Sequence, residues 1–323
     1  MKIKIFCTLG PSSLNKDFLS FSNNNIDLLR LNMSHIKSSS LQKIIKNIKK
    51  YSKVPICIDT EGSQIRTKIK KKTKCFVGKK IIIFKNKGSF KLYPNYVFDK
   101  LKTNDILSIG FEGLSAKVLK KNNNKILLKC LTNGLLETNK GVHLHNRKIK
   151  LKYLTNKDVL AINIAKKEKI KNFALSFTNS KKEIISFNKL LPKERKFFKI
   201  ETKEALHNFK SMTKVTSDFL IDRGDLSKDI SIEDIPSAQR YIFSKKNKKT
   251  NIAIATNFLE SMITKPFPTR GEANDIYTSL EMGASSLVLA AETAVGKYPK
   301  DCVLFLKKII NKFKKNEKKN LLF

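Results

Sequence analysis

The sequence predicts an α/β protein: a (β/α)8 TIM barrel with a small all-β domain inserted after strand 3. Three observations support this prediction. Eight short apolar runs rich in β-branched residues recur along the 323 residues, amphipathic stretches separate them, and one long interval lacks that alternation. An open, doubly wound sheet is the alternative architecture that the same alternation allows.

The eight expected barrel strands are short and end in polar or turn-forming residues, as buried parallel strands do. They lie at 2–10, 26–34, 54–60, 172–178, 196–202, 218–225, 251–256 and 285–293. Amphipathic stretches such as 39–52 and 180–191 separate them and are the expected helices. This order gives one helix after each strand.

The interval 68–141 carries no clear amphipathic helix and is the expected insertion. Short β-like pieces within it are separated by Gly- and Asn-rich turns such as "KNNNK". These pieces are 79–84, 105–110, 116–121 and 125–131. We therefore expect a β-barrel-like lid domain at 68–141 and a catalytic barrel made of 1–67 and 142–323.

The formal charge of +39 allows a polyanion partner, but lysine accounts for it along the whole chain. Only 7 of the 66 basic residues are arginine, which favours compositional drift over a dedicated nucleic-acid surface. We expect no specific nucleic-acid partner. An arginine that persists against such drift marks a place where bidentate binding is needed.

Five cysteines without metal-like spacing predict free, packed thiols in a reducing compartment. No secretory leader and no apolar run of membrane-spanning length is visible in the sequence. These observations predict a cytoplasmic protein with no membrane partner.

Polar residues gather where the expected strands end, which is where a parallel barrel carries its chemistry. They are Arg30, Asn32, Ser34, His35, Asp59, Thr60, Ser176, Lys199, Glu201, Asp222 to Asp225, and Thr256. Strand alternation puts Lys199 and Glu201 on the same side. Glu201 and Asp225, from neighbouring strands, could then share one divalent cation.

Arg30 suits a phosphate group, and Lys199 suits negative charge that develops on a substrate oxygen. Simpler interpretations stay open for these residues. Residues 222–225 could form an ordinary polar turn, and Lys199 with Glu201 could form a plain ion pair. His35 fits a hydrogen-bonded turn residue better than a ligand.

Nine segments, in order along nearly the whole chain, resemble the pyruvate kinase family. They are "KIFCTLGPSS", "LLRLNMSH", "IDTEGSQIRT", "LTNKDVLAINIA", "ALSFTNS", "FKIET", "DRGDLSKDI", "ATNFLESMITKPFPTRGEANDI" and "AETAVGKYP". The resemblance implies transfer of phosphate from phosphoenolpyruvate to ADP, the last step of glycolysis. It also implies a mobile β-domain at the barrel mouth and a homo-oligomer formed through the barrel.

The resemblance assigns roles by position. Lys199, Arg30 and Thr256 would be catalytic, and the substrate would contact Arg30, Ser176, Lys199, Gly224, Asp225 and Thr256. Glu201 and Asp225 would bind Mg2+ or Mn2+, and Asn32, Ser34, Asp59 and Thr60 would bind K+. The nucleotide would contact Asn32, His35, Arg66 and Lys140.

Some positions depart from the family pattern. Glu61 stands where lysine is usual, Ser63 where proline is usual, and Gln64 at the position that tracks potassium dependence. Ala290 and Ala291 replace a serine–glycine pair whose serine is implicated in protonating the enolate. These departures keep a second hypothesis open: a degenerate or repurposed barrel that binds phosphorylated ligands or a partner without turnover.

Two further differences concern the insertion and the end of the chain. "GFEGL" replaces a paired-aspartate turn and leaves Glu112 as one possible carboxylate, and "HLHN" at 143–146 replaces an Asn-Leu-Pro-Gly type of segment. The sequence stops soon after the eighth expected helix, so the C-terminal regulatory domain of the family is expected to be absent. We therefore expect activity without effector regulation.

Overall fold

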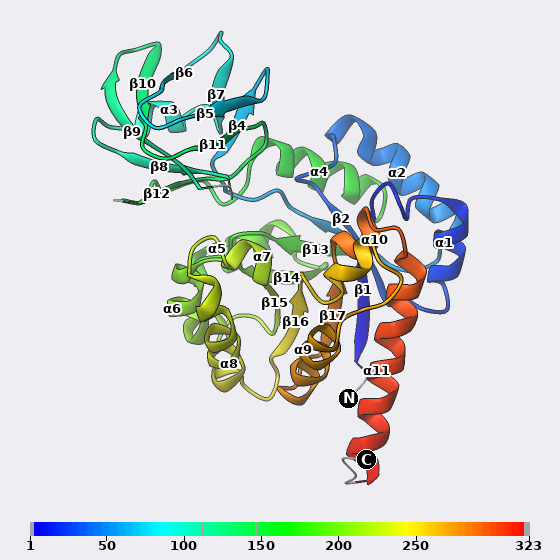
Figure 1. Cartoon of the computed structure of the whole chain (residues 1–323). Coiled ribbons are helices and arrows are strands. Elements are labelled where there is room, and N and C mark those ends of the chain that lie inside the picture. Colours follow the sequence, from blue (N-terminus) through cyan, green and yellow to red (C-terminus); the bar gives the residue numbers. More distant parts are fainter. Residues whose placement is uncertain (1–2, 111–112, 146, 320–323) are drawn as a thin grey trace. The chain divides into compact units, whose positions relative to one another are not determined.

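The computed structural model describes residues 3–110, 113–145 and 147–319, with side chains described as far as residue 317. The chain forms two compact units (Figure 1). The first consists of Met1–Gly62 and Asn156–Phe323, and the second is Ser63–Thr155. The expected insertion, 68–141, lies inside the second unit. Glu112 and Asn146 lie outside the described residues.

Eight parallel strands of the first unit close into a barrel, which confirms the predicted fold and excludes the open sheet. The order around the barrel is β1-β17-β16-β15-β14-β13-β3-β2. The strands are β1 (Lys4–Thr8), β2 (Leu28–Asn32), β3 (Ile56–Asp59), β13 (Asn172–Leu175), β14 (Arg195–Ile200), β15 (Asp218–Asp222), β16 (Asn251–Ala255) and β17 (Ser286–Leu289). Each lies within one of the predicted strands or within one residue of it.

A helix follows each strand, although the second unit intervenes between β3 and its helix. These helices are α1 (Lys16–Ser22), α2 (Ser38–Tyr51), α4 (Asn156–Lys167), α5 (Lys181–Leu190), α6 (Lys203–Met212), α8 (Ile235–Lys245), α9 (Arg270–Glu281) and α11 (Pro299–Lys319). Single turns also follow several strands: α7 (Arg223–Leu226), α10 (Ala291–Ala294), and the 3-10 turns η1 (Ile232–Asp234) and η2 (Glu260–Ile263).

The helices begin and pack as their sequences predict. α2 buries Leu41, Ile45 and Ile48, the spacing of one helical face. α5 begins with a capping box in which the Ser180 and Glu183 side chains each bind the other's backbone N–H.

Aromatic pairs join the helices to the outer faces of the strands. Phe209 of α6 meets Phe219 of β15 edge to face, with ring centroids 4.9 Å apart. Phe187 of α5 meets Phe198 of β14 in the same way at 6.1 Å. All four rings are fully buried, so they anchor helices to the barrel wall.

The inside of the barrel holds an apolar core made by the other face of the strands. Its members are Phe6, Leu28, Cys57, Ala174, Phe197, Leu220, Ala253, Ala255 and Val288. Because side chains alternate along a strand, the next inward position lies two residues further on, toward the carboxyl ends. On six of the strands, that position is polar.

The second unit is mainly β-structure, although the sequence predicted an all-β domain and the single helical turn α3 is an exception. Its main sheet is antiparallel, in the order β12-β8-β9-β10-β6, and two further pairs are β11-β5 and β4-β7. The elements are β4 (Arg66–Ile69), β5 (Thr73–Cys75), β6 (Lys80–Phe84), β7 (Phe90–Tyr93), α3 (Val97–Lys100), β8 (Ile106–Ile109), β9 (Leu114–Lys121), β10 (Lys125–Cys130), β11 (Gly134–Leu136) and β12 (Val142–Leu144). The four β-like pieces predicted from sequence correspond to β6, β8, β9 and β10.

Two arginines of the chain make the bidentate contacts that lysine cannot make. Arg147 donates to both carboxylate oxygens of Asp105, at 2.8 and 2.6 Å. Arg195 donates to both oxygens of Asp218, at 3.2 and 2.9 Å. These pairs agree with the prediction that arginine persists where a fork of donors is needed.

All five cysteines are buried free thiols, as predicted. Among the described residues, no helix has the length and apolar character needed to span a bilayer.

The aromatic contacts predict the cost of losing one ring. Phe209→Ala should lower the free energy of unfolding of the barrel unit by about 3–5 kcal/mol, because it leaves a cavity against Phe219. Phe267→Ala is the matched control, since that ring is 76% exposed and its loss should have little effect. Urea unfolding followed by circular dichroism measures both variants. Equal stabilities for the two would contradict this account of the core.

Candidate active site

A layer of mostly polar side chains covers the apolar core of the barrel at the carboxyl ends of the strands. Counting two residues on from the first core position of each strand gives Thr8, Arg30, Asp59, Ser176, Lys199, Asp222, Ala290 and Ala255, the last of which is itself a core member. The six polar members are all buried. A polar layer on top of an apolar one is the place where a parallel barrel binds its ligand.

Lys199 is the centre of this layer. Its ammonium nitrogen lies 2.6 Å from Glu201 Oε1, 3.2 Å from Asp222 Oδ2 and 3.4 Å from Asp59 Oδ2. Burial alone would lower the pKa of Lys199, but these three carboxylates raise it well above its usual value. Lys199 is therefore a fixed positive charge.

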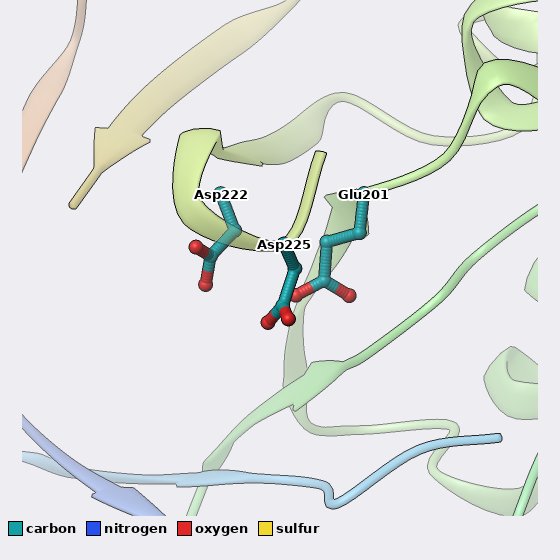
Figure 2. A group of neighbouring side chains, drawn as sticks. All are labelled: Glu201, Asp222 and Asp225. Carbon is teal, nitrogen blue, oxygen red and sulfur yellow. The ribbon is translucent and has the colours of Figure 1, made fainter. Parts of the chain in front are cut away.

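Three carboxylates lie close together and point the same way, and two of them contact Lys199 (Figure 2). Glu201, Asp222 and Asp225 can each offer one oxygen, and these oxygens lie within 4.8 Å of one another. Burial, with Asp225 and Asp222 nearby, raises the pKa of Glu201 despite the opposing charge of Lys199. A cation among these oxygens would relieve that repulsion.

The donor set fits a hard divalent cation. Glu201 Oε2 accepts a hydrogen bond of 2.6 Å from the backbone N–H of Phe177. The other oxygen, Oε1, is buried and pairs with the Lys199 ammonium 2.6 Å away. Carboxylate oxygens of this kind are the ligands that Mg2+ and Mn2+ take in proteins, with water and substrate completing the shell.

Asp225 differs from the other two carboxylates because it is only half-buried. Its Oδ1 is paired with the Lys228 ammonium, three residues along. Within the buried part of the site, two basic side chains contact three acidic ones. The basic residues are Arg30 and Lys199, and the acidic residues are Asp59, Glu201 and Asp222.

Arg30 presents an incompletely used guanidinium group to the site. Its Nε lies 3.5 Å from Asp59 Oδ2, and its NH1 lies 4.0 Å from Asp222 Oδ2. Neither nitrogen makes a hydrogen bond to a described residue, although the side chain is buried. Burial would lower the pKa of Arg30, but Asp59 and Asp222 raise it. Such a group is ready to receive an anion.

Thr256 follows β16 in a left-handed conformation, with φ of 82°, which is unusual for a β-branched residue. Arg223 holds this turn by donating to the Thr256 carbonyl at 3.1 and 2.7 Å. The Thr256 hydroxyl donates to Asp222 Oδ1 at 2.7 Å. Gly224 lies against the Thr256 methyl group, and a β-carbon on Gly224 would come within 2.8 Å of it.

Ser176 joins the layer to the end of β3. Its hydroxyl donates to the Thr60 carbonyl at 2.7 Å and to Asp59 Oδ1 at 3.3 Å. Gly62, with φ of 74°, leaves no room for a β-carbon because Ser176 would be 2.6 Å away. Asp158 of α4 accepts the Gly62 N–H at 3.2 Å and thereby fixes this turn.

The residues expected to bind a monovalent cation lie at the ends of β2 and β3. Asn32 and Asp59 are partners in the strand register. Asn32 Oδ1 accepts the Ser34 N–H at 2.9 Å, and Thr60 Oγ1 accepts the Ser176 N–H at 2.9 Å. His35, expected to contact nucleotide, is exposed in a turn where its N–H binds the Asn32 carbonyl.

The other two expected nucleotide residues, Arg66 and Lys140, lie together in the second unit. Arg66 forms a β-bridge to Gly141 and donates to the Asn139 carbonyl at 3.3 Å. The Lys140 ammonium lies 3.0 Å from a carboxylate oxygen of Glu137.

The positions that depart from the family pattern have distinct surroundings. Glu61 is buried, and its Oε2 pairs with the Lys157 ammonium at 2.9 Å. Gln64 is buried in the second unit, and neither of its amide atoms has a hydrogen-bond partner among the described residues. Ala290 occupies a position of the polar layer, but its side chain is apolar and only its backbone groups are polar. Its N–H donates to Glu292 Oε2 at 2.7 Å.

The structure adds two residues to which the sequence assigned no role. Asp222 is a buried member of the polar layer and contacts Lys199, Arg30 and Thr256. The sequence places it at a strand end, and strand alternation counted from Leu220 directs it inward. Arg223 fixes the Thr256 turn through a backbone carbonyl, and no pattern in the sequence reveals such a contact.

Comparison with known proteins is consistent with this geometry. A family model described as "Pyruvate kinase, barrel domain" matches residues 1–303. Curated relatives include proteins named pyruvate kinase from Methanocaldococcus jannaschii, 33% identical over 95% of this chain, and from Dictyostelium discoideum, 30% identical over 96%. A third, from Staphylococcus epidermidis, is 30% identical over 95%. The matched regions cover 68%, 66% and 56% of those relatives.

The close approach of Gly224 to Thr256 predicts a sharp response to one added methyl group. Gly224→Ala should lower the free energy of unfolding by about 1–3 kcal/mol, because Thr256 is fixed by Arg223 and cannot move away cheaply.

Gly271→Ala is the control, since a β-carbon there meets only the Thr269 hydroxyl at 3.9 Å and alanine favours the helix. Thermal unfolding of both variants tests the contact. A Gly224→Ala protein as stable as the Gly271→Ala protein would rule out a rigid Thr256 turn.

Proposed function

The chain belongs to the pyruvate kinase family, and on this premise we propose that it transfers the phosphoryl group of phosphoenolpyruvate to ADP, giving pyruvate and ATP. The observation that supports the activity best is the buried layer at the barrel's carboxyl ends. There, Arg30 and Lys199 supply two fixed positive charges beside a set of carboxylates. Phosphoryl transfer depends mainly on such positioning and charge neutralisation.

Glu201 and Asp225 are the proposed ligands of Mg2+ or Mn2+. A bound divalent cation would neutralise phosphoryl oxygens and hold the transferring group in line. The chain's own part is to place the two carboxylates. Glu201 is fixed by the Phe177 N–H, and Asp225 by the single turn α7 that follows β15.

Lys199, Arg30 and Thr256 are the proposed catalytic residues. Lys199 is preorganised because three carboxylates and the Ser176 hydroxyl, at 3.3 Å, hold its ammonium in place. Its charge would stabilise the negative charge that grows as the phosphoryl group moves. The guanidinium donors of Arg30 would bind the phosphate. Thr256 would contact the substrate beside the backbone of Gly224 and Asp225, with Ser176 nearby.

The nucleotide and monovalent-cation assignments stay proposals. Asn32, His35, Arg66 and Lys140 would contact ADP, and Asn32, Ser34, Asp59 and Thr60 would hold K+. Three further predictions remain. The protein is expected to be cytoplasmic, to form a homo-oligomer through the barrel, and to show kinetics that do not change when effectors are added.

A second function is favoured by three positions that depart from the family. Ala290 has no hydroxyl group to offer in the polar layer, and Glu61 is an acidic residue at a position where lysine is usual. Gln64 is buried, and its side-chain amide makes no hydrogen bond to the described residues. They are compatible with a barrel that binds phosphorylated ligands or a partner without turnover. Intact Lys199 and Glu201 favour the enzyme.

The metal proposal predicts a loss of cation binding without loss of fold. Glu201→Gln should weaken Mn2+ binding at least about tenfold, because one strong ligand is lost, and should abolish Mg2+-dependent activity. Burial disfavours the charged form of Glu201, so a neutral side chain should not unfold the barrel.

Electron paramagnetic resonance of free Mn2+ gives the affinity, and circular dichroism checks the fold. Glu281→Gln is the control, because this exposed residue ends α9 before the amino end of β17, whereas the polar layer lies at the carboxyl ends of the strands. If Glu201→Gln binds Mn2+ as tightly as the unmodified protein does, Glu201 is not a ligand.

The two functions differ in single-turnover experiments with phosphoenolpyruvate, ADP and Mg2+. Lys199→Met should slow ATP formation by about 10²–10³-fold or more, since a preorganised charge is lost from the transition state. Ala290→Ser should leave ATP formation unchanged and should not slow pyruvate release, because the hydroxyl would act only in the later proton transfer.

ATP formation and pyruvate release are measured separately by rapid quench. Circular dichroism checks the Lys199→Met protein, because it leaves buried carboxylates without their ammonium partner. If the unmodified protein forms no more ATP than Lys199→Met does, turnover is refuted and the binding function replaces it.

A further inference from the structure

Asp222 is unusual among the carboxylates of the site because it contacts all three proposed catalytic residues. Its Oδ1 accepts the Thr256 hydroxyl at 2.7 Å, and its Oδ2 lies 3.2 Å from the Lys199 ammonium and 4.0 Å from Arg30 NH1. Asp59, by comparison, contacts Arg30, Lys199 and Ser176. Among the described residues, no other carboxylate contacts Thr256.

These contacts are those that an oxyanion would receive. A hydroxyl donor, an ammonium and a guanidinium surround one carboxylate, just as they would surround oxygens of a phosphate group. Burial alone would raise the pKa of Asp222, but Lys199, Arg30 and the Thr256 hydroxyl hold it well below its usual value. The carboxylate is therefore charged and firmly bound to the anion-binding groups.

We propose that Asp222 is an internal counter-ion that occupies the anion-binding groups in the absence of a divalent cation, so that a phosphorylated substrate binds well only once the cation is present. This inference rests on the proposed function, since it takes Arg30, Lys199 and Thr256 as the substrate's partners. It assigns a specificity-determining role to a residue outside the set taken from the family.

The charge balance of the buried groups explains the effect on an anion. Arg30 and Lys199 carry two positive charges, and the carboxylates of Asp59 and Asp222 balance them, while burial disfavours the charged form of Glu201. An incoming phosphate therefore meets no net positive charge, and it competes with Asp222 for the same donors. A neutral side chain at position 222 would leave a net positive charge and remove the competition.

A cation site lies within reach as an alternative partner for Asp222. The ligand oxygens of Asp222, Glu201 and Asp225 lie within 4.8 Å of one another. Glu201 is buried, and its Oε1 shares the Lys199 ammonium with Asp222 Oδ2. By turning toward a cation held there, Asp222 would release Lys199 and Arg30 to the substrate. Cation and anion would then bind with positive coupling.

A purely structural role for Asp222 makes the opposite prediction. If the carboxylate only fixes the positions of Lys199 and Thr256, its removal should loosen those groups and weaken anion binding under all conditions. The sign of the change in metal-free affinity therefore separates the two roles.

The test is isothermal titration of phosphoenolpyruvate, without ADP, into Asp222→Asn and the unmodified protein, each with a chelator and again with saturating Mn2+. Asparagine keeps the size of the side chain and an acceptor for Thr256. We expect Asp222→Asn to bind phosphoenolpyruvate about tenfold or more tightly than the unmodified protein without metal, and within about threefold of it with Mn2+. Inorganic phosphate, as a second probe without metal, should show the same gain.

Two further variants make the result decisive. Asp218→Asn removes a carboxylate from the other end of the same strand, where its partner is Arg195, and should leave all anion affinities unchanged. Asp222→Ala also removes the Thr256 acceptor and should still bind the anion more tightly without metal. It replaces Asp222→Asn if that protein does not fold, as judged by circular dichroism.

The outcomes distinguish this inference from the proposed function. Suppose that the unmodified protein binds phosphoenolpyruvate in the presence of Mn2+. If Asp222→Asn then shows no gain in affinity without metal, or an equal gain in affinity with and without metal, the counter-ion role is wrong but the proposed site stands. Weaker metal-free binding in both Asp222 variants would establish the structural role instead. If neither protein binds phosphoenolpyruvate even with Mn2+, the proposed site fails and the inference fails with it.

Discussion

The buried ammonium of Lys199 is the interaction on which the arrangement of the site depends. Three carboxylates converge on it from β3, from β15 and from the end of its own strand, and they would repel one another without it. Burying several charges is costly unless they are paired and fixed by hydrogen bonds. The barrel meets that condition by closing: each strand supplies one member of the layer, and the backbone keeps the members in register.

The periodicity of the strands connects the core to the chemistry. An inward apolar residue, such as Leu220, is followed two residues later by a charged one, Asp222. The same step leads from Phe197 to Lys199. The eight strands and the Lys199–Glu201 pair could be predicted from sequence because both follow from local pattern. The place of Asp222 at a strand end was predicted as well, and the same alternation directs it inward.

The rest of the site could not be predicted because it depends on contacts between distant segments. Nothing local to Thr256 indicates a left-handed backbone, which is held by Arg223 from the preceding strand end. Glycine at position 224 reflects the neighbouring methyl group of Thr256, 32 positions away in the printed sequence. In the second unit, the short strands β4, β5 and β7 have only three or four residues each, too few for a clear alternating pattern.

The distribution of the buried thiols has a consequence for how opening of this protein can be followed. Cys7, Cys57 and Cys302 belong to the barrel unit, whereas Cys75 and Cys130 belong to the β-unit. Alkylation of a buried thiol requires the surrounding structure to open, so its rate reports the free energy of that opening. Mass spectrometry of alkylated peptides would thus follow each unit separately in the native protein, without introducing any probe.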